Sequence, residues 1–167
     1  QRQMCIRDSL SRALDSLNLD DRRGDDLANV QENFRRLCTA LDTDVQRAVL
    51  SRQVHRSDVR RVTAVDCGKG LWQPQDYDSA DALVTDVPGI PLIVFSADCN
   101  VLLLHDPVRR VIGAAHAGWR GTAAGAAWAV SVTVSPTRVS STFLMLAVKA
   151  HVAAAELFAR VEADGPQ

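Results

Sequence analysis

Residues 96–121 of this chain read SADCNVLLLHDPVRRVIGAAHAGWRG, and this stretch decides the fold. Its apolar runs VLLL and VIGAA flank the turn sequence DPVRR and predict two neighbouring strands. Cys99 precedes the first run and follows the run LIVFSA, and His116 ends the second. The small residues of AGWRG then turn the chain into a helix. Strand ends of an α/β sheet are places where side chains meet ligands, so a thiol and an imidazole there predict a site.

The segments upstream of this stretch predict more of the same sheet. Residues 81–98 add apolar runs split by PGIP, and together with residues 100–116 they predict a sheet buried on both faces or nearly so. Residues 48–65 are rich in valine and predict one or two short strands separated near residues 56–58. Period two puts Gln53 and His55 on the same face. Residues 66–79 contain two glycines and a proline, and we expect a loop.

Helices are predicted at three places. Within residues 24–44 the apolar side chains recur at the three-and-four spacing of one helical stripe, at Leu27, Val30, Phe34, Leu37 and Leu41. Asp25 and Asp26 can cap the start of this helix. A second helix is expected over residues 122–130 with Thr122 as its cap, and a third over residues 143–161.

Composition limits the classes of function. The chain has 167 residues, 47% hydrophobic and 23% charged, which suits one globular domain. A net charge of -1 gives no field that attracts nucleic acid or an anionic membrane, and no apolar run approaches a membrane span. The first ten residues lack the apolar core of a secretory signal, and the four cysteines form no CxxC pair. We therefore expect a cytoplasmic protein with a small-molecule partner.

Three residues are candidate metal ligands: His55, Cys99 and His116. Two imidazoles and one thiolate are the number of protein donors that a catalytic zinc ion takes while leaving one position for water or substrate. Taken singly, the cysteine is as well explained by core packing, and the histidines by ordinary strand positions. A thiolate needs a cation, a metal or a helix terminus nearby. Because Asp98 beside Cys99 works against ionisation, a metal is the more economical explanation.

Three further residues are candidates for substrate binding and proton handling. Arg120 stands at the expected start of a helix, where a guanidinium and free amides favour an anion such as phosphate, although an ordinary surface arginine fits as well. Gln53 is a second substrate or phosphate candidate, because it shares a face with His55. Asp98 is our candidate for orienting a ligand or handling a proton.

The motifs QVH, ADALVT, SADC and HAGWRG occur in this order, and with RGDDLANVQENFRRL they make the chain resemble the laccase-domain family of purine nucleoside phosphorylases. This family is also called multicopper polyphenol oxidases and peptidoglycan editing factors. The resemblance implies an α/β (α+β) fold, with mixed β-sheets sandwiched by helices in alpha-beta-beta-alpha layers. It also implies a zinc site made by His55, Cys99 and His116. The implied activities are phosphorolysis of adenosine, inosine and methylthioadenosine and deamination of adenosine, with a homodimer as the assembly.

The resemblance covers about residues 24–130 and has departures. Arg56 follows QVH where the family has glycine, and Asn100 and Val101 follow ADC where proline is common at the second place. We expect residues 1–16 to be an extraneous or disordered leader, residues 17–130 the laccase-like catalytic domain, and residues 131–167 a divergent segment. A core truncated in this way predicts a chain of low stability or activity.

Three other chemistries stay open from the residues alone. A copper-dependent polyphenol oxidase would bind one copper ion through the same two histidines and cysteine, with Met4 or Met145 as a weak axial ligand. The four histidines of the chain are too few to form a trinuclear copper cluster in addition to that site. A metal-free hydrolase would use Cys99 as nucleophile and His116 as base. A structural zinc site would need a fourth donor, such as Cys67 or Asp98.

Overall fold

The computed structural model describes residues 17–20, 24–126 and 129, which divide after Val45 into two compact units. The first contains helix α1 (Leu27–Ala40). The second contains six strands and the short helix α2 (Trp119–Ala123), in the part of the chain described. The predicted combination of mixed sheets and helices is confirmed. None of the described helices is long and apolar enough to span a membrane.

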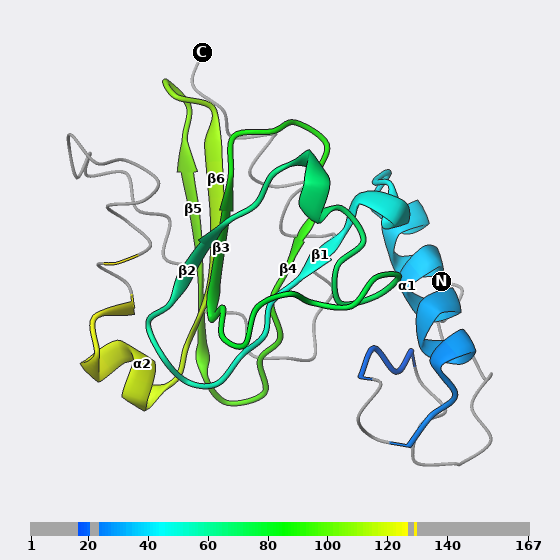
Figure 1. Cartoon of the computed structure of the whole chain (residues 1–167), viewed down its shortest axis with the longest axis horizontal. Helices are drawn as coiled ribbons and strands as arrows, with labels where there is room; N and C mark the ends of the chain where they lie inside the picture. Colours follow the sequence, from blue (N-terminus) through cyan, green and yellow to red (C-terminus); the bar gives the residue numbers. More distant parts are fainter. Residues whose placement is uncertain (1–16, 21–23, 127–128, 130–167) are drawn as a thin grey trace, which may run out of the picture. The chain divides into compact units, whose positions relative to one another are not determined.

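Four strands of the second unit form one mixed sheet in the order β2-β3-β6-β5 (Figure 1). Their bounds are β2 (Val59–Arg61), β3 (Ala82–Thr85), β5 (Asn100–Asp106) and β6 (Val111–Ala117). β2 runs parallel to β3, and β6 is antiparallel to both β3 and β5. Every residue of β3 is buried, whereas β5 is only partly buried. The prediction of a doubly buried sheet therefore holds for its centre and not for β5.

The hairpin of β5 and β6 agrees closely with the two strands and the turn predicted from the sequence. Oδ1 of Asp106 accepts hydrogen bonds from the backbone amides of Val108 and Arg109, at 2.9 and 3.0 Å, and so closes the predicted DPVRR turn. The register pairs Val101 with His116. This pairing sets the end of β6, with its imidazole, beside the start of β5, where Cys99 precedes the strand.

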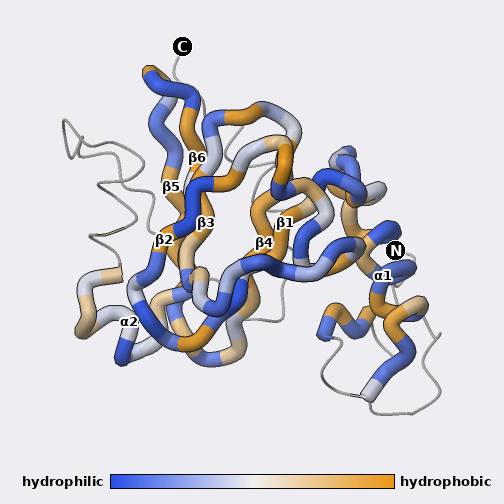
Figure 2. The backbone as a smooth tube through the Cα atoms, viewed as in Figure 1, coloured by the Kyte–Doolittle hydropathy of each residue, from blue (hydrophilic) through white to orange (hydrophobic). Residues whose placement is uncertain are grey.

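The core of the second unit lies on both faces of β3. One cluster comprises Val49, Val62, Tyr77, Ala80, Leu83 and Ile90. The other comprises Ala82, Val84 and Ala115. Strands β1 (Val49–Leu50) and β4 (Leu92–Ile93) form a separate parallel pair, and Figure 2 shows both as hydrophobic stretches of the chain. Alternating side chains of one buried strand thus serve two apolar clusters.

Helix α1 forms where the sequence predicts a helix, but its buried residues differ from the predicted ones. Asp26 caps the helix by accepting a hydrogen bond from the amide of Ala28 at 2.9 Å. Leu27, predicted on the buried stripe, is 51% exposed. The buried helix residues are Val30, Asn33, Phe34 and Cys38. The stripe therefore begins one turn later, and the polar Asn33 belongs to it because its amide donates to the carbonyl of Asn18.

Other predicted elements are shorter or begin elsewhere. Between β1 and β2, residues 51–58 form no strand apart from an isolated bridge at Arg52, so period two does not relate Gln53 to His55. β4 ends at Ile93, well before Cys99. α2 begins at Trp119 with Gly118 as its cap, and the proposed cap Thr122 instead donates its hydroxyl to the carbonyl of Ala117. The helix predicted over residues 143–161 lies outside the described residues.

The expected loop over residues 66–79 is confirmed. After the short helix η4 (Ala64–Asp66), residues 67–79 form no helix or strand beyond a bridge between Lys69 and Gln73. Asp66 is buried and accepts hydrogen bonds from Arg60 and Lys69, each at 2.7 Å. The hydroxyl of Tyr77 donates to the carbonyl of Leu50 at 2.6 Å. The loop is thus fixed by buried polar contacts.

Candidate metal centre

The first predicted ligand, His55, lies in an irregular segment with an uncommon backbone. Its φ angle is 61°, in the left-handed region that a non-glycine residue adopts at some energetic cost. The backbone amides of Val54, His55 and Arg56 all donate to the carboxylate of Asp81, at 2.9 to 3.0 Å. These three bonds hold the segment in its turn.

Cys99 immediately precedes β5 and is partly buried. Its backbone carbonyl accepts a hydrogen bond from the hydroxyl of Ser96. Burial raises the pKa of the Cys99 thiol above its ordinary value, and the adjacent carboxylate of Asp98 raises it further. Asp98 Oδ1 lies 3.9 Å from the sulfur. A cation at this position would be needed to favour the thiolate.

His116 is buried at the penultimate position of β6, and its ring is oriented by Asp81. Nδ1 of His116 lies 3.0 Å from Oδ1 of Asp81. Burial alone would raise the pKa of Asp81, but hydrogen bonds from the amides of Arg56, Val54 and His55 and from the His116 ring outweigh it and lower the pKa. Oδ1 of Asp81 therefore acts as an acceptor and receives a hydrogen bond from Nδ1–H of His116.

The structure brings the three predicted ligands together. One donor atom from each of His55, Cys99 and His116 lies within 4.8 Å of the others. Sγ of Cys99 is 3.9 Å from Nε2 of His55, and the two imidazole rings meet edge to face with centroids 4.8 Å apart. Among the residues that the structure describes, this group contains no fourth histidine, cysteine or carboxylate. The arrangement can hold a metal ion with a coordination position left for another ligand.

Gly118 leaves room for this group. A Cβ atom built on Gly118 would lie 2.8 Å from Cδ2 of His55 and 3.1 Å from Sγ of Cys99. Its φ of -65° is open to any residue, so contact with the ligands, and not backbone conformation, makes glycine necessary here. The glycine between β6 and α2 thus lets the chain pass directly beside the three donors.

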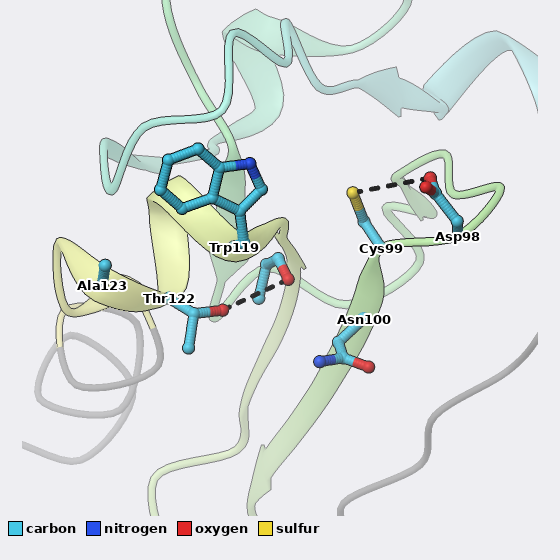
Figure 3. Close-up of a pocket in the computed structure, with 7 residues that line it drawn as sticks. Asp98, Cys99, Asn100, Trp119, Thr122 and Ala123 are labelled. Atoms are coloured by element: carbon cyan, nitrogen blue, oxygen red, sulfur yellow. Dashed lines mark hydrogen bonds between the residues drawn. The ribbon is translucent and has the colours of Figure 1, made fainter.

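A pocket of about 550 Å³ adjoins Cys99. Its lining residues are Asp98, Cys99, Asn100, Ala117, Trp119, Thr122 and Ala123. Figure 3 shows Trp119 on α2 and the Cys99 thiol before β5 on either side of this space. Trp119 is 75% exposed although it is a large apolar side chain. The pocket therefore offers an aromatic surface next to the candidate metal ligands.

The other predicted residues lie in different surroundings. Arg120 is exposed, with its guanidinium 5.2 Å from the centre of the Trp119 ring, and it does not line the pocket. The amide of Gln53 bonds to the backbone of Phe95 at both ends, accepting at 2.7 Å and donating at 2.8 Å. Cys67 packs against the core cluster around Leu83 and is not in the ligand group. Met4 and Met145 lie outside the described residues.

Asp81 is not among the candidates that the sequence singles out, yet its side chain contacts two of the three candidate ligands. We expected Asp98 to orient a ligand, but in the structure it is Asp81 that contacts an imidazole, and Asp98 is next to the sulfur. Asp81 stands in ADALVT, one of the motifs that carry the resemblance, directly before β3. That position, directly before a buried strand and polar in an otherwise apolar run, is the signal that points to it.

Comparisons with known proteins agree with the family that the sequence motifs indicate. The family model described as "Multi-copper polyphenol oxidoreductase laccase" matches residues 6–156. A purine nucleoside phosphorylase YlmD of Geobacillus stearothermophilus is 41% identical over 116 residues, which cover 67% of this chain and 41% of that protein. A purine nucleoside phosphorylase of Deinococcus radiodurans is 46% identical over 106 residues, covering 64% of this chain and 38% of that protein. The chain thus spans about two fifths of the length of these relatives.

Solved structures show the same likeness. The YfiH protein of Bacillus licheniformis superposes with a TM-score of 0.63 at 35% identity, over 72% of this chain and 45% of that one. The structure of YlmD from Geobacillus stearothermophilus gives a TM-score of 0.60 at 41% identity, over 67% and 42%. With a family match that covers most of its length, the chain belongs to the multi-copper polyphenol oxidoreductase laccase family.

Proposed function

We propose that this chain carries the metal centre of a zinc-dependent purine nucleoside phosphorylase. The observation that carries the proposal is the convergence of His55, Cys99 and His116 within 4.8 Å, beside a pocket of about 550 Å³. Relatives 41% and 46% identical are named purine nucleoside phosphorylases. Because the chain spans about two fifths of those relatives, the activity of the whole protein is part of the proposal.

The donor set fits zinc. Tetrahedral bonds of ordinary Zn–S and Zn–N length place neighbouring donors about 3.3–3.6 Å apart. The sulfur of Cys99 and Nε2 of His55 are 3.9 Å apart, and all three donors lie within 4.8 Å of one another. The side chains would therefore have to approach one another by up to roughly 1.5 Å to bind the ion. Two neutral imidazoles and one thiolate leave a net positive charge on the ion and one open position. When bound there, zinc supplies Lewis acidity to a substrate oxygen or a water molecule.

The chain's own residues supply binding and orientation. The pocket beside Cys99 has the size of a small-ligand site, and the exposed ring of Trp119 is suited to stack on a purine. We assign phosphate binding to Arg120, whose exposed guanidinium lies over the same indole, and we retain Gln53 as a second candidate. The carboxylate of Asp98 lines the pocket and is our candidate for holding a proton during the reaction.

In phosphorolysis, phosphate attacks the anomeric carbon of the ribose, the glycosidic bond breaks, and the purine leaves with a proton. The products from adenosine are adenine and ribose 1-phosphate. We propose adenosine, inosine and methylthioadenosine as substrates. Deamination of adenosine, a second proposed activity of the same centre, consumes water and releases inosine and ammonia. The two reactions are therefore separated by their products.

Two other activities use the same residues. The sulfur of Cys99 lies 3.9 Å from Nε2 of His55, so a metal-free hydrolase built on this contact would use His55 as its base. The base expected from the sequence, His116, lies 3.0 Å from Asp81 through Nδ1. A copper-dependent polyphenol oxidase is favoured by the description of the family model. Activity that survives a chelator but not a thiol alkylator would support the hydrolase. Intense visible absorption after copper loading, with turnover of phenols, would support the oxidase.

The decisive experiment is metal analysis of the purified chain together with a product assay on adenosine and phosphate. We expect one zinc per chain and, in keeping with the low activity expected from the sequence, slow release of adenine. We expect Cys99→Ala to lose both. Cys67→Ala is the matched control, because Cys67 is a free cysteine packed against the core outside the ligand group. A chain that retains stoichiometric zinc after Cys99→Ala would refute the proposed centre.

We also propose a homodimer in a reducing, cytoplasmic compartment. Cys38, Cys67 and Cys99 are free thiols in the described part of the structure. A ligand such as Cys99 binds metal as a thiolate, so the compartment must keep it from oxidation. Size-exclusion chromatography with light scattering tests the dimer.

A further inference from the structure

The carboxylate of Asp81 contacts both histidine ligands at once. Its side chain is fully buried. Oδ1 accepts hydrogen bonds from the backbone amide of His55 at 2.9 Å and from Nδ1 of His116 at 3.0 Å. Oδ2 accepts from the amides of Val54 and Arg56, each at 3.0 Å. One buried carboxylate therefore has four donors, and all of them belong to the two ligands or to the immediate neighbours of His55.

The contacts on the His55 side hold an uncommon backbone. His55 has φ of 61°, and a non-glycine residue in this region is disfavoured by about 1–2 kcal/mol. Three consecutive amides aimed at one carboxylate offset this energy, because hydrogen bonds to a charged acceptor are stronger than those between neutral groups. Without the carboxylate, nothing in these contacts would keep the three amides on one side of the turn.

The hydrogen bond between Asp81 and His116 determines which nitrogen of the His116 ring carries the proton. Three backbone amides already donate to the two oxygens of Asp81, so this side chain faces His116 as an acceptor and the ring carries its proton on Nδ1. The lone pair then lies on Nε2, the nitrogen that remains for a metal ion. The backbone strengthens this arrangement, since the amide of His116 donates to the carbonyl of Asp81 at 2.8 Å.

We propose that Asp81 is the positioning residue of the metal centre, which orients both imidazoles by fixing the tautomer of His116 and the left-handed turn of His55. The proposal rests on the proposed function, because it assumes that these imidazoles bind a metal ion. The two acidic residues then have different roles. Asp81 orients the imidazoles through hydrogen bonds, whereas Asp98 lines the pocket.

The test is Asp81→Asn, which keeps the size of the side chain but replaces one acceptor oxygen with a donor. If the new amide faces His116, it forces the proton to Nε2. If it faces Val54 and Arg56, it opposes two backbone donors. Either orientation damages one ligand. We expect zinc affinity, measured by competition with a chromogenic chelator, to fall 10–100-fold.

Asp66→Asn is the matched control. Asp66 is also a buried carboxylate with charged and backbone donors, but its partners are Arg60, Lys69 and Thr63. We expect this variant to lose stability while its zinc affinity stays within about twofold of the unmodified chain. Equal zinc affinities for the unmodified chain and Asp81→Asn would overturn the proposal.

A second measurement needs no metal. In the unmodified apo chain, long-range ¹H–¹⁵N spectra should show His116 with its proton on Nδ1, and the amides of residues 54–56 should exchange slowly although all three residues are exposed. A proton on Nε2, or rapid exchange of these amides in the folded chain, would refute the positioning role even if Asp81→Asn does not fold. A chain that shows both signatures but takes up no zinc would refute the proposed function and leave the role of Asp81 in ordering the two histidines supported.

Discussion

Gly118 lies so close to His55 that an added Cβ atom would be 2.8 Å from Cδ2 of the imidazole. Real Cβ atoms do not approach other atoms so closely, so Gly118→Ala must displace the ring of His55 or the nearby sulfur of Cys99. We expect this variant to bind zinc at least about tenfold more weakly, in line with the effect of disturbing groups that orient metal ligands. Competition with a chromogenic chelator measures the affinity.

Gly125→Ala is the control for this prediction. Gly125 has φ of +84°, and a Cβ atom there would meet nothing within 4 Å. Alanine should therefore strain the backbone and lower the free energy of unfolding by about 1 kcal/mol, with zinc affinity unchanged. Equal zinc affinities for both glycine variants would show that the space beside His55 is not needed.

The sequence predicts the candidate ligands better than it predicts the hydrogen bonds that orient them. Cys99 and His116 stand out as candidate ligands because each lies at the end of an apolar run, and the hairpin register brings those ends together. The position of Asp81 in an apolar run marks the residue, but the sequence does not predict its four side-chain contacts, because they reach residues 25 to 35 positions away. The turn at His55 escapes for a related reason. Tertiary hydrogen bonds to Asp81 hold its left-handed backbone, whereas alternation alone suggests an extended strand.

Zinc should stabilise the folded chain through the candidate ligands. Binding to the native state alone raises the free energy of unfolding by about 2.7 kcal/mol when free zinc is 100-fold above its dissociation constant. We expect this gain in the unmodified chain and in Cys67→Ala, and its loss in Cys99→Ala. Thermal unfolding followed by circular dichroism, with zinc and then with excess chelator, measures it. A gain in Cys99→Ala equal to that of the unmodified chain would show that zinc acts elsewhere.

Asp66 predicts an acid-dependent loss of stability. Burial would raise its pKa, but hydrogen bonds from Arg60, Lys69 and the amide of Thr63 prevail and hold the pKa far below its ordinary value. A carboxyl group with a lowered pKa in the folded state stabilises the fold above the pKa of the unfolded chain, near 4, and this contribution disappears as the pH falls further. The free energy of unfolding should therefore decline below about pH 4.

The Asp66→Asn variant isolates this contribution. Urea unfolding between about pH 6 and pH 3 should give a smaller decline for Asp66→Asn than for the unmodified chain. Asp86→Asn, which removes an exposed carboxylate paired with Arg61, should follow the unmodified chain closely. Parallel curves for Asp66→Asn and the unmodified chain would contradict the assignment.

Gln53 links the segment that carries His55 to the segment that leads to Cys99, since its amide bonds to both backbone groups of Phe95. Gln53→Glu places a carboxylate oxygen opposite the Phe95 carbonyl, where the amide nitrogen now donates. We expect a loss of about 1–3 kcal/mol in the free energy of unfolding, together with weaker zinc binding. Gln73→Glu, at an exposed position, is the control and should change neither quantity. If Gln53→Glu instead unfolds like the unmodified chain and only raises KM for phosphate or nucleoside, Gln53 is a substrate-binding residue and not a brace between the two ligand segments.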